Sequence, residues 1–167
     1  NKFTLADCKR KFFPKGKFIS ETIIQLRPDN QPRSSLNLFF DKGRLVRRDS
    51  KHKWVPRDWN EIEITTQSKE RTKDYPRGEF TAWAKDDGKF YKIKMISSGG
   101  NVGSKKVYKD IMSRPARSIL GELIKGKLQR LGHLEEGERI TSDTLESYGR
   151  NYILLKKIKD KTYYLDF

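Results

Sequence analysis

An Asp-Gly pair within the segment 86–88 constrains the fold of this chain more than any other short motif. Two apolar runs flank it, at 80–85 and at 89–96. A turn of this composition between two such runs is a strong signal for a β-hairpin. Because side chains alternate between the two faces of a strand, Lys92 and Lys94 fall opposite the apolar residues of the second run, on the outward face. The chain is therefore predicted to contain a central antiparallel hairpin.

Further segments have the apolar patterns of strands. Residues 18–26 alternate imperfectly and fit either a strand or a short helix, and residues 35–40 fit a strand. Residues 60–66 alternate between polar and apolar, as expected of a half-buried strand. Residues 152–158 and 162–167 predict a closing hairpin around a short turn.

Two helices are predicted in the second half of the chain. The first covers 116–131, where apolar residues fall on one stripe, and Gly121 and Gly126 each weaken it by about 1 kcal/mol relative to alanine. The second covers Ser142–Tyr148 and ends at Gly149. The fold is therefore predicted to be mainly β with two helices. A closed or nearly closed small barrel fits best, because such a sheet leaves few exposed edges.

Length and composition favour one folded domain over residues 1–167. The chain is long enough to bury a core, and its three Trp, seven Tyr and nine Phe residues argue against disorder. Its single cysteine, Cys8, excludes an internal disulfide and fits a reducing compartment. No apolar run approaches the roughly 20 residues of a membrane span. The first residue is Asn1 rather than methionine, so we expect a piece of a longer protein.

Positive charge is concentrated in two segments. Residues 42–57 carry seven Lys and Arg and one acid, and residues 89–117 carry eight Lys and Arg and one acid. Together they supply +13 of the formal net charge of +15. A charge excess confined to two segments, rather than spread evenly, predicts two surfaces that bind a polyanion, with nucleic acid as the best candidate.

The candidate contacts in and near these segments combine cations with hydrogen-bonding side chains. Arginine can read guanine through two hydrogen bonds, whereas lysine mainly contacts phosphates. Asn101 suits adenine, and the neighbouring glycines let the backbone approach closely. A solubilising basic loop and a flexible lysine-rich tip are the plain alternatives. The predicted DNA-binding residues are Arg33, Ser35, Asn37, Lys42, Arg44, Arg47, Arg48, Asp49, Ser50, Lys51, His52, Lys53, Trp54, Arg57, Lys92, Lys94, Ser97, Ser98, Asn101, Ser104, Lys105, Lys106 and Lys109.

No catalytic site and no metal site is predicted, and no cofactor is expected for this domain. The two histidines, His52 and His133, are far apart, and no cluster of His, Cys and carboxylates has metal-ligand spacing. Glu61 and Glu63 fit an outward, solvated strand face better than a nuclease site. The acidic pair at 86–87 fits a turn. The chain by itself is therefore not expected to be an enzyme.

The order of these elements resembles a B3-like DNA-binding domain, a distorted β-barrel (DNA-binding pseudobarrel) with two arms that grip the major groove. More narrowly, it resembles the C-terminal specificity domain of the phospholipase-D-type restriction endonucleases. The resemblance extends from about residue 20 to the end of the chain. The matching pieces are SSLN at 34–37, Arg57, NEIEI at 60–64, DDGK at 86–89, LG at 120–121, RLG at 130–132, IT at 140–141, Leu145, YGR at 148–150 and TYYLDF at 162–167.

The resemblance implies that an arm near 33–59 and an arm near 92–109 recognise bases, and these ranges coincide with the two basic segments. It also implies that the parent is a type II restriction endonuclease of the bacterial cytoplasm, either a monomer or a dimer, with a catalytic domain upstream in the same polypeptide. One departure limits the comparison, because Leu38-Phe39 follow the S-x-L-N motif where the family has Trp-Gly. The phospholipase-D motif, a histidine and a lysine two apart and then an acid, is absent, since His52 directly precedes Lys53.

Sequence-specific binding of double-stranded DNA is the leading functional hypothesis. The alternative is a non-specific binder of single-stranded nucleic acid or RNA, which needs aromatic rings on a strand face, with Trp83 and Tyr91 as candidates. A nuclease that uses Glu61, Glu63 and Asp86 is a third hypothesis. Binding to a membrane surface or an acidic protein is disfavoured, because no basic amphipathic helix with a wide apolar face is evident in the sequence.

Overall fold

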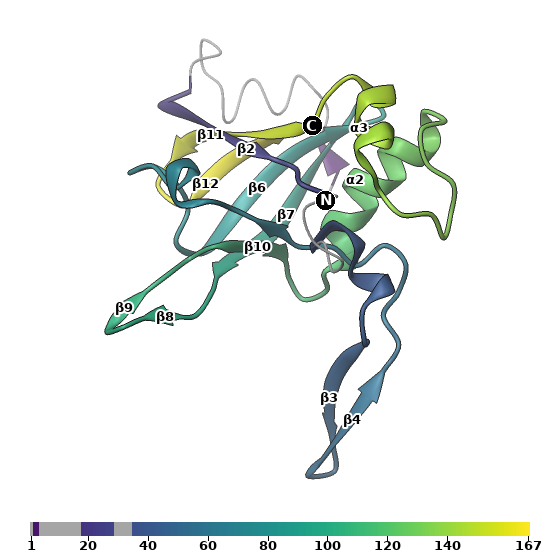
Figure 1. Cartoon of the computed structure of the whole chain (residues 1–167). Helices are drawn as coiled ribbons and strands as arrows, with labels where there is room; N and C mark the ends of the chain where they lie inside the picture. The colour runs from purple at the N-terminus through teal and green to yellow at the C-terminus, as the bar shows by residue number, and fades with distance from the viewer. Residues whose placement is uncertain (1, 4–17, 29–34) are drawn as a thin grey trace.

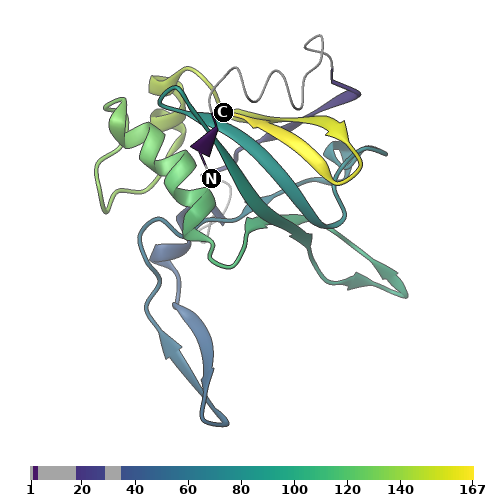
Figure 2. The same ribbon diagram turned by 180° about the vertical axis from the view of Figure 1, so that it is seen from behind.

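The computed structural model describes residues 2–3, 18–28 and 35–167. These residues form a strongly curled main β-sheet with two α-helices gathered on one side of it (Figures 1 and 2). Arg33, a predicted DNA contact, and Cys8 lie outside the described residues. The strands of the main sheet are β1 (Lys2–Phe3), β2 (Ser20–Gln25), β5 (Ile64–Thr65), β6 (Gly78–Asp86), β7 (Lys89–Ser98), β10 (Asp110–Ser113), β11 (Tyr152–Lys159) and β12 (Thr162–Asp166).

The main sheet has mixed topology and curls into a half-barrel. Seven strands follow the order β2-β11-β12-β6-β7-β10-β5, and β1 pairs with β7 from outside this path. All pairs are antiparallel except β12 with β6, which is parallel. The expected hairpins β6–β7 and β11–β12 are present, and Asp87 and Gly88 turn the first with φ of 49° and 74°. The prediction of a mainly β, barrel-like fold is confirmed.

Helix α2 (Ser118–Arg130) packs its apolar stripe onto the core of the half-barrel. Leu120, Ile124 and Leu128 are fully buried, as the spacing predicts. The predicted range extended to Leu131, but the helix ends one residue earlier and this side chain is 50% exposed. Leu123, which is 7% exposed, joins them, so the helix contributes four apolar side chains to the core.

Helix α3 (Ser142–Tyr148) has the bounds that its local signals predict. The Thr141 hydroxyl accepts a hydrogen bond from the backbone N–H of Thr144 at the start, and Gly149 ends the helix with φ of 90°. Both signals act within one helical turn, so no distant contact is needed to place them. Within the described ranges, no helix has the length and apolar composition needed to cross a membrane.

The strand expected at 35–40 is instead a 3-10 helix, η2 (Ser35–Phe40). Three consecutive side chains, from Leu36 to Leu38, are buried, which a strand with one solvated face cannot achieve because its side chains alternate. The amide of Asn37 donates to the carbonyl oxygen of Ile140 and accepts from its N–H, both at 2.8 Å. Asn37, a predicted DNA contact, is 5% exposed, and both polar atoms of its amide hold a distant backbone segment in place.

Lys125 is fully buried in helix α2. Its Nζ donates a hydrogen bond to the Trp59 carbonyl oxygen at 2.6 Å and lies 5.0 Å from the centre of the Trp59 ring. Burial lowers the pKa of this lysine from 10.5 to about 8. The lysine therefore links α2 to the residues that follow β4 (Lys51–Val55) while keeping a charge that the folded state disfavours.

The depressed pKa of Lys125 predicts a specific pH dependence of stability. Between about pH 8 and pH 10.5 the unfolded chain binds more protons than the folded chain, so the free energy of unfolding rises with pH in this window. Between about pH 7.5 and pH 9.5, the free energy of unfolding of the wild type should rise by about 2 kcal/mol relative to that of Lys125→Met, as measured by urea unfolding. The difference between the two proteins isolates Lys125, because the contributions of all groups that titrate alike in both proteins cancel. Parallel stability curves would contradict the assignment.

Candidate nucleic-acid interface

Two short hairpins project from the main sheet. Each of them forms a separate two-stranded sheet. Both extend beyond the body of the domain from its lower side in Figures 1 and 2, with β8–β9 at one end of that side and β3–β4 at the other. The first hairpin comprises β3 (Arg44–Arg48) and β4 (Lys51–Val55), and the second comprises β8 (Asn101–Val102) and β9 (Lys105–Lys106).

The β3–β4 hairpin is a regular antiparallel ribbon. Its register pairs Arg44 with Val55 at the root and Arg48 with Lys51 next to the turn. The turn residues, Asp49 and Ser50, have φ of 50° and 64°, the left-handed values that a tight two-residue hairpin turn requires. The exposed cations and hydrogen-bonding groups of the tip therefore have defined positions. The exposed predicted residues of this segment are Lys42, Arg47, Arg48, Asp49, Ser50, Lys51, His52, Lys53 and Trp54.

A buried carboxylate fastens the root of the β3–β4 hairpin. Glu61 is only 2% exposed, so the prediction of a solvated strand face is wrong. Its Oε1 lies 2.9 Å from Nη1 of Arg44 and 3.8 Å from Nη1 of Arg57, on either side of the hairpin. Its Oε2 accepts a hydrogen bond from the backbone N–H of Asp58 at 2.8 Å. Arg44 and Arg57, both predicted DNA contacts, are thus ion-paired at the root.

Gly43 completes this root by allowing a close backbone approach. Its φ is 97°, and a Cβ atom at this position would overlap the carbonyl oxygen of Val55. The Gly43 carbonyl oxygen in turn accepts a hydrogen bond from Nε of Arg57 at 3.1 Å. The two segments that flank the hairpin at its base are therefore held together by contacts that fix its direction relative to the domain.

The β8–β9 hairpin is fastened at its root by neutral hydrogen bonds. The Ser97 hydroxyl forms hydrogen bonds with the Tyr75 hydroxyl and with the Tyr108 carbonyl oxygen, both at 3.1 Å. Ser97, a predicted DNA contact, is 1% exposed, and in this structure its hydroxyl serves the root of the hairpin. A Cβ atom at Gly99 would overlap the carbonyl oxygen of Val107, which shows how closely the two segments of the backbone approach at the root.

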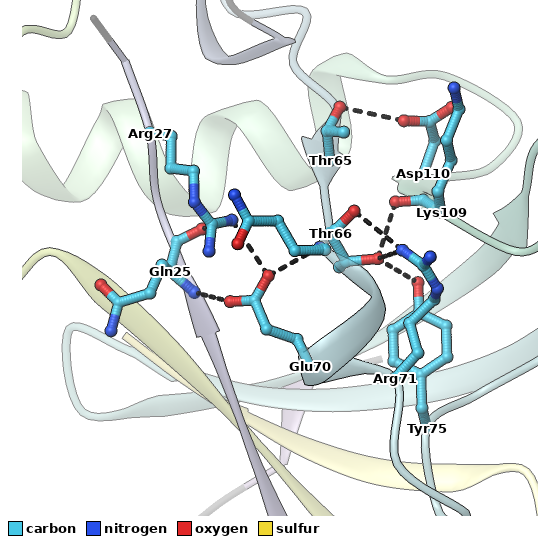
Figure 3. Close-up of polar contacts among 10 residues, drawn as sticks. Gln25, Arg27, Thr65, Thr66, Glu70, Arg71, Tyr75, Lys109 and Asp110 are labelled. Atoms are coloured by element: carbon cyan, nitrogen blue, oxygen red, sulfur yellow. Dashed lines mark hydrogen bonds and ion pairs between the residues drawn. The ribbon is translucent and has the colours of Figure 1, made fainter. Parts of the chain in front are cut away.

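Figure 3 shows how the chain that leaves β8–β9 is attached to the domain. The carbonyl oxygen of Lys109 accepts hydrogen bonds from the N–H of Thr66 at 2.7 Å and from its hydroxyl at 2.9 Å. The Thr65 hydroxyl donates to Asp110 at 2.9 Å. Since the backbone of Lys109 is held in this way, its exposed side chain starts from a defined position.

The same network contains a buried carboxylate, Glu70, at the end of the 3-10 helix η3 (Ser68–Glu70). Burial alone would raise the pKa of Glu70, but hydrogen bonds from Arg27 and from the backbone of Gln25 and Gln67 outweigh it and hold the pKa below 4.5. The carboxylate therefore stays charged at neutral pH and joins η3 to β2 (Figure 3). Both of its oxygens accept hydrogen bonds from the fold, so Glu70 has a structural role.

The remaining predicted residues lie in three kinds of position. Lys92 and Lys94 are exposed on β7 within the main sheet, as the alternation predicts, and not on the β8–β9 hairpin. Ser35 and Ser98 are half-buried. The exposed predicted residues on the β8–β9 hairpin and next to its root are Asn101, Ser104, Lys105, Lys106 and Lys109.

The structure also exposes apolar residues that the sequence analysis did not select. Leu45 on β3 is 51% exposed and Val102 on β8 is 71% exposed. Apolar residues in strand patterns are normally assigned to a core, and only the separation of the two hairpins from the main sheet reveals that these side chains face solvent. Among the described residues, no group of three or more His, Cys, Asp and Glu side chains is arranged to hold a metal ion.

Comparison with known families assigns this architecture. The sequence model of the NgoFVII C-terminal B3-like DNA-binding domain matches residues 15–159, a range that includes both projecting hairpins. A search among curated proteins found no match. The match confirms the resemblance inferred from the sequence. The chain therefore belongs to the family of NgoFVII C-terminal B3-like DNA-binding domains.

Proposed function

We propose that this domain recognises one short sequence of double-stranded DNA by placing the β3–β4 and β8–β9 hairpins in the major groove. One observation carries the proposal. Two cationic hairpins that are separated by 45 residues of sequence, from Val55 to Asn101, project from the same side of the domain (Figure 1). The major groove is about 12 Å wide and admits a two-stranded β-ribbon. Two such ribbons on one side of a rigid sheet are suited to clasp one duplex.

The exposed side chains divide into those suited to bases and those suited to phosphates. Arg47 can donate two hydrogen bonds to guanine, and Asn101 suits adenine. Arg48, Lys105 and Lys106 are suited to contact phosphates regardless of sequence. Specificity is therefore expected to depend mainly on Arg47 and Asn101, and affinity on all the cations.

The parent protein is proposed to be a restriction endonuclease with its cleavage domain upstream of this chain. The family match, which is to a C-terminal domain, supports this arrangement. The DNA-binding domain itself is proposed to need no cofactor, since Lys, Arg and polar side chains suffice to bind phosphates and base edges. The parent is proposed to act as a dimer if its recognition sequence is palindromic, because the symmetry of a site mirrors that of its protein.

The alternative of a single-stranded nucleic-acid binder receives less support from the structure. Such a protein needs exposed aromatic faces on which bases stack. Phe80, Trp83 and Phe90 are 5%, 2% and 3% exposed, and the half-buried Tyr91 packs against the core. The strand face that would have served as a stacking platform is therefore largely occupied by the fold itself.

A competition experiment tests the proposed function. Site selection from random duplexes should yield one short sequence, which the domain binds roughly 10³-fold more tightly than a scrambled duplex in fluorescence anisotropy at moderate salt. Lys105→Ala should weaken binding to both duplexes alike and reduce the salt slope by about one, because it removes one phosphate contact. Equal displacement of the probe by specific and scrambled competitors would refute sequence-specific binding.

A further inference from the structure

The two faces of the β3–β4 hairpin differ in chemistry. Directly paired residues of an antiparallel ribbon lie on the same face. The pairs Leu45 with Trp54 and Arg47 with His52 therefore share one face, which we call the apolar face. The opposite, cationic face consists of Arg44, Val46, Arg48, Lys51, Lys53 and Val55.

The apolar face exposes two large side chains side by side. Leu45 is 51% exposed and its partner Trp54 is 58% exposed. At the root of the hairpin, Trp54 and Phe39, which is 40% exposed, line a pocket of about 460 Å³. A continuous exposed apolar surface on an otherwise polar element is typical of an interaction site. More than half of the surface of Leu45 and of Trp54 is therefore not buried by the fold.

The charges around this surface identify the class of partner. Five of the ten strand residues of the hairpin are Lys or Arg, and the turn carries the single acid, Asp49. A partner of this hairpin must therefore combine negative charge with apolar groups at close range. Duplex DNA does so in the major groove, where thymine presents its C5-methyl group between two rows of phosphates. Long Arg and Lys side chains from the cationic face can extend around the ribbon to those phosphates.

We infer that the apolar face of the β3–β4 hairpin lies against the base edges and that Leu45 and Trp54 pack on thymine C5-methyl groups. The inference rests on the proposed function and adds to it the chemical group that these two residues read. Arg47 and His52 lie nearer the tip on the same face and supply donors to the neighbouring base pairs. This face thus combines methyl contacts near its root with hydrogen bonds near its tip.

Uracil substitution tests the inference, because it deletes only the methyl group of thymine. Each thymine of the selected site is replaced in turn, and binding is measured for the wild type, Leu45→Ala and Trp54→Ala. Loss of one buried methyl group should weaken wild-type binding about fourfold at one or two positions. At those positions the two variants should bind thymine and uracil duplexes within about twofold of each other. Val46→Ala, which shortens an apolar side chain on the cationic face, is the matched control and should discriminate as the wild type does.

The outcomes separate this inference from the proposed function. A selected site in which every uracil substitution is neutral, or which contains no thymine, overturns the methyl contact while sequence-specific binding stands. Failure to select any sequence overturns the proposed function and the inference with it. Trp54→Ala could instead change the oligomeric state in size-exclusion chromatography while it discriminates uracil from thymine as the wild type does. This result would assign the apolar face to a protein contact and would also overturn the inference. Since both side chains are more than half exposed, the variants should keep the unfolding midpoint of the wild type.

Discussion

Reversing the charges of Arg48 and Lys51 together, as Arg48→Glu and Lys51→Glu, is expected to weaken DNA binding by about 100-fold or more. These residues are paired across the ribbon next to the turn of β3–β4, and both are exposed. The change removes two favourable phosphate contacts and places two like charges against the phosphates. Binding isotherms at several salt concentrations should also show a slope reduced by about two, since about one counterion is released per contact.

A matched control distinguishes hairpin contacts from a general effect of net charge. Lys159 and Lys161 are exposed at the turn of the β11–β12 hairpin, which lies on the upper side of the domain, remote from the tip of β3–β4 (Figures 1 and 2). Lys159→Glu with Lys161→Glu alters the net charge by the same amount and should weaken binding only about threefold, because charges beyond a Debye length are screened. Equal losses in the two double variants would show that the β3–β4 hairpin has no special role.

The substitution Gly121→Ala is expected to destabilise the domain by about 3 kcal/mol. A Cβ atom at Gly121 would overlap the carbonyl oxygen of Asn60, so helix α2 could not keep its distance from this loop. Asn60 directly precedes Glu61, which fastens the root of β3–β4. Displacement of the helix should therefore weaken DNA binding as well as folding. Urea unfolding and anisotropy on the same samples measure the two effects.

Gly126 on the same helix is the control for this prediction. Among the described residues, nothing lies within 4 Å of a Cβ atom placed there. Gly126→Ala should therefore stabilise the domain by about 0.5–1 kcal/mol, because alanine is the better helix former and has the less flexible unfolded chain. If Gly121→Ala and Gly126→Ala both stabilised the domain, the close approach of α2 to Asn60 would be wrong.

Elements whose signals are local were predictable from the sequence. The β6–β7 hairpin depends on two turn residues between apolar runs, and α3 depends on one capping threonine and one terminal glycine. The concentration of charge in two segments also identified both hairpins as candidate binding elements before their strands were known. Propensity and charge act over a few residues, so distant contacts did not change these results.

Elements that depend on distant contacts were not predictable. Residues 35–40 have the composition of a strand, yet their burial on both sides and the bonds of Asn37 to Ile140, 103 residues away, select a 3-10 helix. Glu61 looked solvated because its partners, Arg44 and Arg57, belong to the hairpin that it fastens. Alternation divides the residues of a strand between its two faces, but only the neighbouring elements decide which face is covered.

The residues alone predict the mainly β character of this protein, helices α2 and α3 of the part that the structure describes, and the location of the excess charge. The folded arrangement was needed to show which cations are exposed at hairpin tips, which are ion-paired at a root, and that Leu45 and Trp54 are exposed together. Charge and turn propensity are properties of short segments. Burial, pairing and the placement of two hairpins on one side of the domain result from how a curled sheet brings together residues that are far apart along the chain.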